Sequence, residues 1–493
     1  MIPMTLAEIA EATGGRLHSP DGTATGDEIV TGTVEFDSRA IGPGGLFVAM
    51  PGERVDGHDF AARAVADGAV GVLAAREVDA PAVLVPPVAV DEPSRVYALA
   101  GDTDGSGAAV LTGFAAVARE VARRLTANGM LTVGVTGSAG KTSTKDLIAA
   151  LLSARGATVA PPGSFNNEIG HPWTVLRADE HTKHLVLELS ARGVGHIAGL
   201  CEIAPPRIGA VLNVGTSHIE EFGSQETIAQ AKGELVEALP SAHDGGVAVL
   251  NADDPFVAAM AARTKARVLT FGLAEHADVR GADVELDATA RPSFTLVTEA
   301  GEARVALLLH GAHQVGNALA AAAVALAAGM PLADVAAGLS TATAVSARRM
   351  AVETTDEGVT VINDSYNASP EATREALKTL VAISGAGTGR AWAVLGPLAE
   401  MGSDHDRIHE EIGRLAADLA VDRLVVVGAA AQPMHRGASR AGSRGEEPVL
   451  VPDVNAAVDL LRAELRAGDV VLVKASNAQR LWRVADALLG SRA

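Results

Sequence analysis

The stretch LTVGVTGSAGKTS, residues 131–143, decides the fold of this chain of 493 residues. Its apolar first part predicts a buried strand over 131–135, and a helix is predicted to follow over 142–154. A glycine-rich turn between a strand and a helix lets backbone N–H groups converge on one point, where the helix N-terminus adds partial positive charge. The stretch therefore predicts a phosphate-binding loop in an α/β protein.

Side chains in this loop favour a nucleotide ligand. Lys141 is placed to reach the β- and γ-phosphates of ATP, and the Thr142 hydroxyl to contact Mg²⁺. The strict Walker pattern is missed by one position, because Val135 stands where its first glycine belongs. The alternative is a tight turn with a solvated lysine, which the strand-then-helix context disfavours. The predicted loop comprises Gly137, Ser138, Ala139, Gly140, Lys141, Thr142 and Ser143.

Apolar runs continue the pattern on both sides of the loop. Strands alternating with helices predict a mostly parallel sheet. An antiparallel hairpin pair is predicted within 283–309, and an Ala-rich helix over 317–328. The remaining strands are predicted at 46–50, 70–74, 82–85, 185–189, 208–214, 247–250, 268–271, 359–363, 392–396, 424–428 and 470–474.

These runs predict three α/β domains. Residues 1–108 form a small N-terminal α/β domain, ending in a Gly- and Asp-rich linker at 101–107. Residues 109–343 form a central P-loop-type domain, with helices on both faces of a mostly parallel sheet. Residues 344–493 repeat the doubly wound pattern and predict a Rossmann-like C-terminal domain.

Composition excludes several classes of protein. The net charge of −20 repels phosphate backbones, so we expect no nucleic-acid partner. Cys201 is the single cysteine, which fits a reducing compartment. We expect no signal peptide, because the opening residues include acidic ones and lack a long apolar core, and the longest apolar stretch, 318–330, is too short to span a bilayer. We expect a cytoplasmic protein with no integral membrane association.

Three residues outside the loop are candidate metal ligands. Glu188 ends an apolar strand, where a carboxylate suits Mg²⁺ at the carboxyl edge of a sheet; the alternative is a surface glutamate. His218 follows a strand and fits a metal ligand or an ordinary loop histidine equally well. Lys232 lies on a predicted helix, where a lysine is usually solvated. Its ammonium cannot bind Mg²⁺, but a carbamate formed on the neutral amine could.

Candidate nucleotide contacts lie further along the chain. Asn317 opens the Ala-rich helix and fits either a contact to an adenine edge or, more simply, a helix cap. Arg349 could clamp a transferring phosphoryl group. Asp364 could hold ribose or Arg349. Surface ion pairing is the simpler interpretation of both charged residues.

Together these motifs resemble the Mur ligase superfamily, over essentially the whole chain. The family's motifs appear in order: GSAGKTS (137–143), LELSARG (187–193), NVGTSHIEEFG (213–223) with AKGEL (231–235), GAHQVGN (311–317), and RRM (348–350) followed by NDSYN (363–367). Within the superfamily the chain is most similar to members that add D-alanyl-D-alanine to a UDP-N-acetylmuramoyl-tripeptide. That similarity is carried by residues 36–60, 165–172, 191–206 and 363–370.

The resemblance implies a role for each matching position. Lys141, Lys232, His218 and Arg349 would be catalytic, and Thr142, Glu188, His218 and carbamylated Lys232 would hold Mg²⁺. Asn317, Arg349 and Asp364 would join the loop in binding ATP. Asp37, Ser38 and Arg39 would bind the uridine nucleotide, Asn166 and Asn167 the muramoyl part, and Tyr366 and Asn367 the dipeptide. The resemblance further implies an enzyme of peptidoglycan synthesis with an acyl-phosphate intermediate, and we expect it to be a cytoplasmic monomer.

Some positions depart from the family pattern. Pro397 stands where an acidic residue is common, Ala475 where glycine is common and Asn477 where arginine is common, all near the expected dipeptide site. These departures bear on amino-acid specificity more than on ATP chemistry. Alternatives are a diaminopimelate- or lysine-adding relative, a folylpolyglutamate synthase, an inactive nucleotide-binding homologue or a generic P-loop hydrolase. The Asp-Asn-Pro-Arg motif usual in the diaminopimelate-adding relative is absent.

Overall fold

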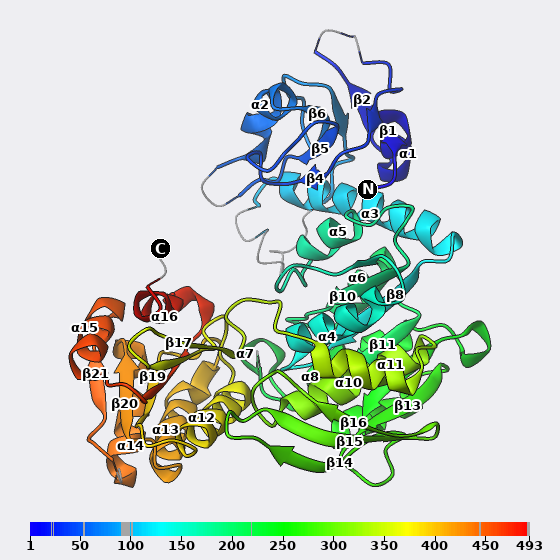
Figure 1. Ribbon diagram of the computed structural model, residues 1–493. Coiled ribbons are helices and arrows are strands. Elements are labelled where there is room, and N and C mark those ends of the chain that lie inside the picture. The colour runs from blue at the N-terminus through cyan, green and yellow to red at the C-terminus, as the bar shows by residue number, and fades with distance from the viewer. Residues whose placement is uncertain are drawn as a thin grey trace.

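The computed structural model describes residues 1–20, 22, 24–52, 55–89, 99, 102–217, 219–442 and 445–490. In these residues three larger sheets follow one another along the chain, each with its own helices (Figure 1). The fold is α/β with mostly parallel sheets, as the sequence predicts. Within the same residues, none of the helices is long and apolar enough to cross a membrane.

The N-terminal sheet has the order β2-β7-β6-β5-β4. Its strands are β2 (Arg16–His18), β4 (Val34–Glu35), β5 (Gly45–Val48), β6 (Ala69–Ala74) and β7 (Ala82–Leu84). β2 is antiparallel to β7 and the other pairs are parallel. Two short strands, β1 (Met4–Thr5) and β3 (Ile29–Val30), pair beside it, and the helices are α1 (Leu6–Thr13) and α2 (Ala61–Ala66).

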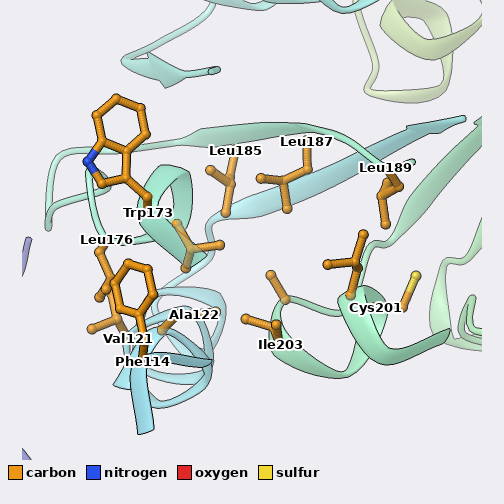
Figure 2. Packing of buried hydrophobic residues seen from close by; sticks show 14 of the residues in the cluster. Phe114, Val121, Ala122, Trp173, Leu176, Leu185, Leu187, Leu189, Cys201 and Ile203 are labelled. Carbon is orange, nitrogen blue, oxygen red and sulfur yellow. The ribbon is translucent and has the colours of Figure 1, made fainter. Parts of the chain in front are cut away.

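Helix α3 (Ser106–Ala127) joins the N-terminal and central sections and includes the last two residues of the predicted linker. The helix begins inside 101–107, where Gly101 itself lies outside the described residues. Phe114 and Val121 of α3 pack in one buried cluster that reaches from Met4 to Ala266. Figure 2 shows α3 side chains beside Trp173 and the strand residue Leu185. The apolar face of α3 therefore joins the hydrophobic cores of the N-terminal and central sections into one.

The central sheet has nine strands in the order β16-β15-β14-β13-β12-β11-β8-β10-β9. They are β8 (Leu131–Thr136), β9 (Thr158–Val159), β10 (His184–Glu188), β11 (Ile208–Val211), β12 (Val247–Asn251), β13 (Arg267–Gly272), β14 (Val279–Leu286), β15 (Pro292–Thr298) and β16 (Gly301–Ala306). β15 pairs antiparallel with both β14 and β16, and the remaining pairs are parallel. The predicted hairpin pair is thus present, as an extension of the main sheet.

Side chains alternate between the two faces of this sheet, as strand geometry requires. Leu185 and Leu187 of β10 belong to one buried cluster, and Val186 belongs to another. Helices α5 (Gly170–Val175), α6 (His196–Ile203) and α8 (Gln225–Glu237) contribute to the first cluster. Helices α4 (Lys141–Ser153), α10 (Gln314–Ala327) and α11 (Leu332–Thr341) contribute to the second. Half of the residues of α10 are alanines, which lets it pack closely against α4.

The C-terminal sheet has the order β17-β18-β22-β19-β20-β21, with only β17 antiparallel. Its strands are β17 (Ala351–Thr354), β18 (Thr360–Asn363), β19 (Ala391–Leu395), β20 (Arg423–Val427), β21 (Val449–Val451) and β22 (Val470–Lys474). Helices α12 (Pro370–Ser384), α13 (His405–Asp418) and α14 (Gln432–Ala441) cover one face. Helices α15 (Val454–Glu464) and α16 (Trp482–Leu488) cover the other, as a Rossmann-like domain requires.

Candidate active site

The phosphate loop lies between two neighbouring strand ends. Strand β8 pairs with β10 on one side and β11 on the other, and Glu188 is in register with Val135. The loop that leaves β8 is therefore flanked by Glu188 and by the segment 212–217 that follows β11. Ligands of parallel α/β sheets bind at this carboxyl edge.

The loop has the conformation that a phosphate cradle requires. Gly140 has φ +83°, and a Cβ there would lie 2.4 Å from Oδ1 of Asn317, so only glycine fits. Nζ of Lys141 donates to the Gly137 carbonyl at 2.7 Å. The N–H groups of residues 140–143 make no hydrogen bond to any other residue that the structure describes. Four donors at a helix N-terminus are thus available to an anion.

Glu188 connects the loop to the neighbouring strand. Its side chain is 1% exposed. Oε2 accepts a hydrogen bond from the Thr142 hydroxyl at 3.0 Å, and Oε1 accepts from Nδ2 of Asn166 at 2.6 Å. The predicted metal ligand is thus a buried carboxylate beside the loop, not a surface glutamate. Asn166, predicted to face the muramoyl group, is hydrogen-bonded to this carboxylate.

Lys232 is buried in α8 near the loop. It is 5% exposed, and no hydrogen bond or ion pair joins its amine to the described residues. Burial lowers the pKa of Lys232 well below its usual value, and the positive charge of Lys141 lowers it further. Burial also lowers the pKa of Lys141, although Glu188 opposes that shift. Lys232 is therefore a buried lysine rather than the solvated one that its helix position suggests.

Arg349 reaches this site from the C-terminal section. Its Nη2 donates to the hydroxyl oxygen of Thr142 at 3.1 Å and to that of Ser164 at 2.9 Å. The guanidinium lies 4.2 Å from the ring centroid of Tyr366. A second contact joins the same two sections, because Glu371 accepts hydrogen bonds from the Thr216 amide and hydroxyl at 3.0 and 2.8 Å.

Asp364 has a partner that sequence reasoning missed. Its carboxylate forms a buried ion pair with Lys474, and Oδ1 accepts from the Met350 amide at 3.1 Å. Of the two alternatives for Asp364, ribose or Arg349, a bond to Arg349 is absent among the described contacts, where Arg349 donates to Thr142 instead. The sequence signal for this pair was the lysine that ends the buried strand 470–474. That strand, β22, pairs with β18, which ends just before Asp364.

The interpretation of Asn317 as a helix cap is also wrong. Helix α10 begins at Gln314 after His313, so Asn317 lies inside its first turns. Its Oδ1 accepts from the Thr144 hydroxyl at 3.3 Å, and Nδ2 donates to Gln314 at 2.9 Å. The side chain lies against Gly140, which brings Asn317 to the phosphate loop.

The predicted uridine motif lies in the N-terminal section, after β4. Nη2 of Arg39 donates to Oδ2 of Asp37 at 2.7 Å, and the Arg39 side chain is 86% exposed. This guanidinium holds the pKa of Asp37 at about 2. Two residues immediately before the motif contact Trp173 of the central section: Glu35 accepts from its indole N–H at 2.9 Å, and Phe36 meets its ring edge-on. Ser38, which is half-buried, follows Asp37 and begins the turn that contains Arg39.

Three loops of the C-terminal sheet meet where the dipeptide is expected. They follow the adjacent strands β18, β22 and β19. Nζ of Lys474 donates to the Asn367 carbonyl at 3.0 Å, and the Ser476 amide donates to the Pro397 carbonyl at 3.2 Å. Asn477 lies exposed in the loop after β22. Asn167, predicted to face the muramoyl part, lies in the central section and accepts a hydrogen bond from the Gly170 amide at 2.9 Å, at the start of α5.

His218 lies outside the described residues, so its placement is not part of the site geometry. Among the residues that are described, no three His, Cys, Asp or Glu side chains gather closely enough to hold a metal ion. The buried Glu188 carboxylate beside the Thr142 hydroxyl still fits Mg²⁺, which prefers oxygen ligands and takes several of them from phosphates and water.

The family models match in the same order as the sheets. The Mur ligase family catalytic domain matches residues 32–102, the Mur ligase middle domain 135–325, and the Mur ligase glutamate ligase domain 348–477. A protein of Mycobacterium tuberculosis named UDP-N-acetylmuramoyl-tripeptide–D-alanyl-D-alanine ligase is 55% identical, over 99% of this chain and 98% of its own. The chain belongs to the Mur ligase family.

Other relatives of this Mur ligase agree. The Escherichia coli protein of the same name is 33% identical over 87% of this chain and 86% of its own. A crystal structure of MurF from Acinetobacter baumannii has a TM-score of 0.83 at 26% identity, with 99% of both chains covered. The MurF ligase of Thermotoga maritima in complex with ADP has a TM-score of 0.75 at 28% identity, covering 94% of this chain and 98% of that one. The resemblance predicted from the motifs is confirmed.

Proposed function

We propose that this Mur ligase uses ATP to join D-alanyl-D-alanine to the terminal carboxylate of UDP-N-acetylmuramoyl-tripeptide, in the synthesis of peptidoglycan precursors. One observation carries the ATP chemistry: a loop with four available N–H donors and Lys141 is hydrogen-bonded through Thr142 to the buried Glu188. The substrates are supported by relatives of that name whose similarity extends over nearly the full length of both chains.

The reaction needs an activated acid, because a carboxylate would have to expel oxide or hydroxide. A carboxylate oxygen of the tripeptide attacks the γ-phosphorus of ATP, the bond from that phosphorus to the bridging oxygen breaks, and ADP leaves. The amine of D-alanyl-D-alanine then attacks the acyl carbon and loses a proton. The carbon–oxygen bond breaks and inorganic phosphate departs. The products are an amide, ADP and phosphate.

Bringing two anions together is the main physical difficulty. The charges of Lys141 and Arg349, with the N–H groups of residues 140–143, offset the charge that spreads over the transferring phosphoryl group. We assign Mg²⁺ to Thr142, Glu188, His218 and carbamylated Lys232; when bound, the ion would add positive charge at the phosphates.

The burial of Lys232 supports the carbamate. Burial lowers the pKa of this amine, which has no partner among the described residues, so it gives up its proton more readily; the neutral amine attacks CO₂ and loses a proton to give a carbamate. The product presents two oxygens in place of an ammonium. Such oxygens suit a magnesium site, whereas an ammonium does not.

The C-terminal domain would close the site. An acyl phosphate hydrolyses readily, so water must be excluded before it forms. Arg349 already contacts Thr142 and Ser164 across the predicted boundary at 343/344. Asn317, Arg349 and Asp364 are assigned to ATP, Asp37, Ser38 and Arg39 to the uridine nucleotide, Asn166 and Asn167 to the muramoyl part, and Tyr366 and Asn367 to the dipeptide. We also propose that the enzyme acts as a monomer.

An acceptor panel tests the proposal. The enzyme is given ATP, Mg²⁺ and UDP-N-acetylmuramoyl-tripeptide with D-alanyl-D-alanine, and phosphate release is measured. Parallel reactions supply the matching shorter UDP-substrate with diaminopimelate or lysine, or a folate with glutamate. We expect release only with the tripeptide and D-alanyl-D-alanine together. Release with another pair would identify a different ligase, and nucleotide binding without release from any pair would identify an inactive homologue.

A further inference from the structure

Asn213 is the residue after Leu212 at the end of the β11 segment, and it faces the phosphate loop. Its Oδ1 accepts a hydrogen bond from the Ala139 amide at 2.9 Å, and its Nδ2 donates to the Ala139 carbonyl at 3.1 Å. Its main-chain carbonyl accepts from the Ser138 amide at 3.1 Å. The Asn213 side chain therefore binds both the amide and the carbonyl of Ala139, as the backbone of a neighbouring strand would.

These bonds divide the loop into two halves. The amides of Ser138 and Ala139 are used by Asn213, whereas the amides of residues 140–143 make no hydrogen bond within the described chain. The first half is fixed by protein, and the second half is left for a ligand. Fixing the first half sets the direction of the free N–H groups, because the two halves are continuous backbone.

Only a carboxamide serves both bonds. Asparagine supplies one acceptor and two donors on a short side chain, whereas aspartate is acceptor-only and leucine has neither. The close packing leaves little room for another arrangement: a Cβ on Gly137 would lie 2.9 Å from Cβ of Leu212 and 3.4 Å from the Asn213 amide nitrogen. The segment after β11 thus supports the loop directly, at the edge where the strict Walker pattern is missing its first glycine.

We propose that Asn213 is a positioning residue, which holds residues 138–139 so that the free N–H groups of residues 140–143 converge on the β-phosphate of the nucleotide. This inference rests on the ATP site proposed above and adds a residue to it. Asn213 acts through the loop and does not itself contact the nucleotide.

Asn251 provides a matched control. It ends β12, the strand next to β11, and its carboxamide also donates one hydrogen bond and accepts one. Nδ2 donates to the Leu212 carbonyl at 2.8 Å, and Oδ1 accepts from the Asp253 amide at 2.9 Å. Neither partner belongs to the phosphate loop. Asn251→Ala therefore removes the same chemistry from the same edge of the sheet without releasing the loop.

The experiment measures how much the β-phosphate adds to affinity. The dissociation constants of AMP and ADP are determined by calorimetry for the native enzyme, Asn213→Ala and Asn251→Ala. We expect Asn213→Ala to reduce the preference for ADP over AMP by about 10-fold or more, as the loss of two hydrogen bonds suggests. AMP affinity should change by less than about 3-fold, and Asn251→Ala should keep the native preference. Asn213→Ser, which can restore one bond, should be intermediate.

Two failures are distinguishable. If the native enzyme binds ADP no better than AMP, the proposed nucleotide site is wrong. If the native enzyme prefers ADP and Asn213→Ala retains that preference, or both alanine variants lose it equally, the site stands and the role of Asn213 is overturned. Should Asn213→Ala fail to fold, as judged by its thermal midpoint, Asn213→Ser carries the same test with the same two outcomes.

Discussion

The phosphate loop and the uridine motif differ in how much of their structure exists before a ligand arrives. Around the loop, Thr142, Glu188 and Arg349 come from separate parts of the chain and are already hydrogen-bonded together. The uridine motif is bonded mainly to itself, through the exposed pair of Asp37 and Arg39. One region is preassembled, and the other exposes charge at the surface.

This difference suggests a division of labour. A preassembled, partly buried cluster stabilises charge in the transition state without reorganising, which favours catalysis. An exposed arginine with one surface partner can exchange that partner for a phosphate at little cost, which favours recognition. Substitutions near the loop should therefore affect turnover, and substitutions in the motif should affect substrate affinity.

Lys141→Ala should give the largest effect. Removing the charge that we assign to the transferring phosphoryl group should lower the ligation rate by about 10³-fold or more, measured as phosphate release. Binding of the UDP-tripeptide, measured by calorimetry, should remain within about 3-fold of native. Lys378→Ala, which removes an exposed lysine paired with Glu375, should change neither. Loss of UDP-tripeptide binding in Lys141→Ala would show that the two regions are not separable.

Lys232→Ala should give the next largest effect. Loss of the proposed carbamate should reduce turnover by about 10²-fold, and added acetate or propionate should restore part of it by supplying carboxylate oxygens in the space left behind. The exposed Lys265 provides a control, because Lys265→Ala should be active and indifferent to these additives. Full activity of Lys232→Ala without an additive would remove the carbamate from the mechanism.

Arg39→Ala tests the predicted role of the uridine motif in substrate affinity. Removing the cation should raise KM for the UDP-tripeptide by about 10-fold while kcat and ADP affinity stay near native, because the charge-assisted contact that is lost belongs to the N-terminal section and not to the phosphate loop. Arg16→Ala removes another exposed arginine of the same section, paired with Glu77, and should leave KM unchanged. A fall in kcat with KM unchanged would contradict the proposed division.

The smallest effect concerns the place where the N-terminal and central sections meet, at Trp173 and Glu35. His171 lies in α5 beside Trp173, and burial lowers its pKa to about 4. Since the folded state disfavours the protonated ring, its stability contribution is present above pH 6.5 and is lost as pH falls toward 4. When the pH is lowered from 7.5 to 5.5, the free energy of unfolding should therefore fall by about 1 kcal/mol less in His171→Leu than in the native protein. The exposed His181 provides a control, because His181→Leu should retain the native slope in urea unfolding; an unchanged slope in His171→Leu would refute the assignment.

Local patterns predicted much of this architecture. The loop, the strand ending at Glu188 and the helices on both faces follow from hydrophobic period and turn chemistry, which act over a few residues. Family motifs added Lys232, whose burial no local pattern reveals. The domain boundaries at 108/109 and 343/344 stay predictions, as do the roles of the site residues.

Contacts between distant segments were not predictable in the same way. The pairing of Asp364 with Lys474 depends on β18 and β22 being neighbours, and the bonds from Asn213 to Ala139 depend on β11 lying beside β8. The Ser164 hydroxyl at Arg349 was missed for the same reason. A sequence shows which residues end strands, but strand order decides which of those ends meet.

The central claim is that ATP activates the peptide acid, and an oxygen label tests it directly. UDP-tripeptide with ¹⁸O in its terminal carboxylate is ligated to D-alanyl-D-alanine, and the released phosphate is examined by mass spectrometry. Attack of the carboxylate on the γ-phosphorus requires one labelled oxygen to leave with the phosphate. Unlabelled phosphate, accompanied by normal formation of the amide, would contradict the account.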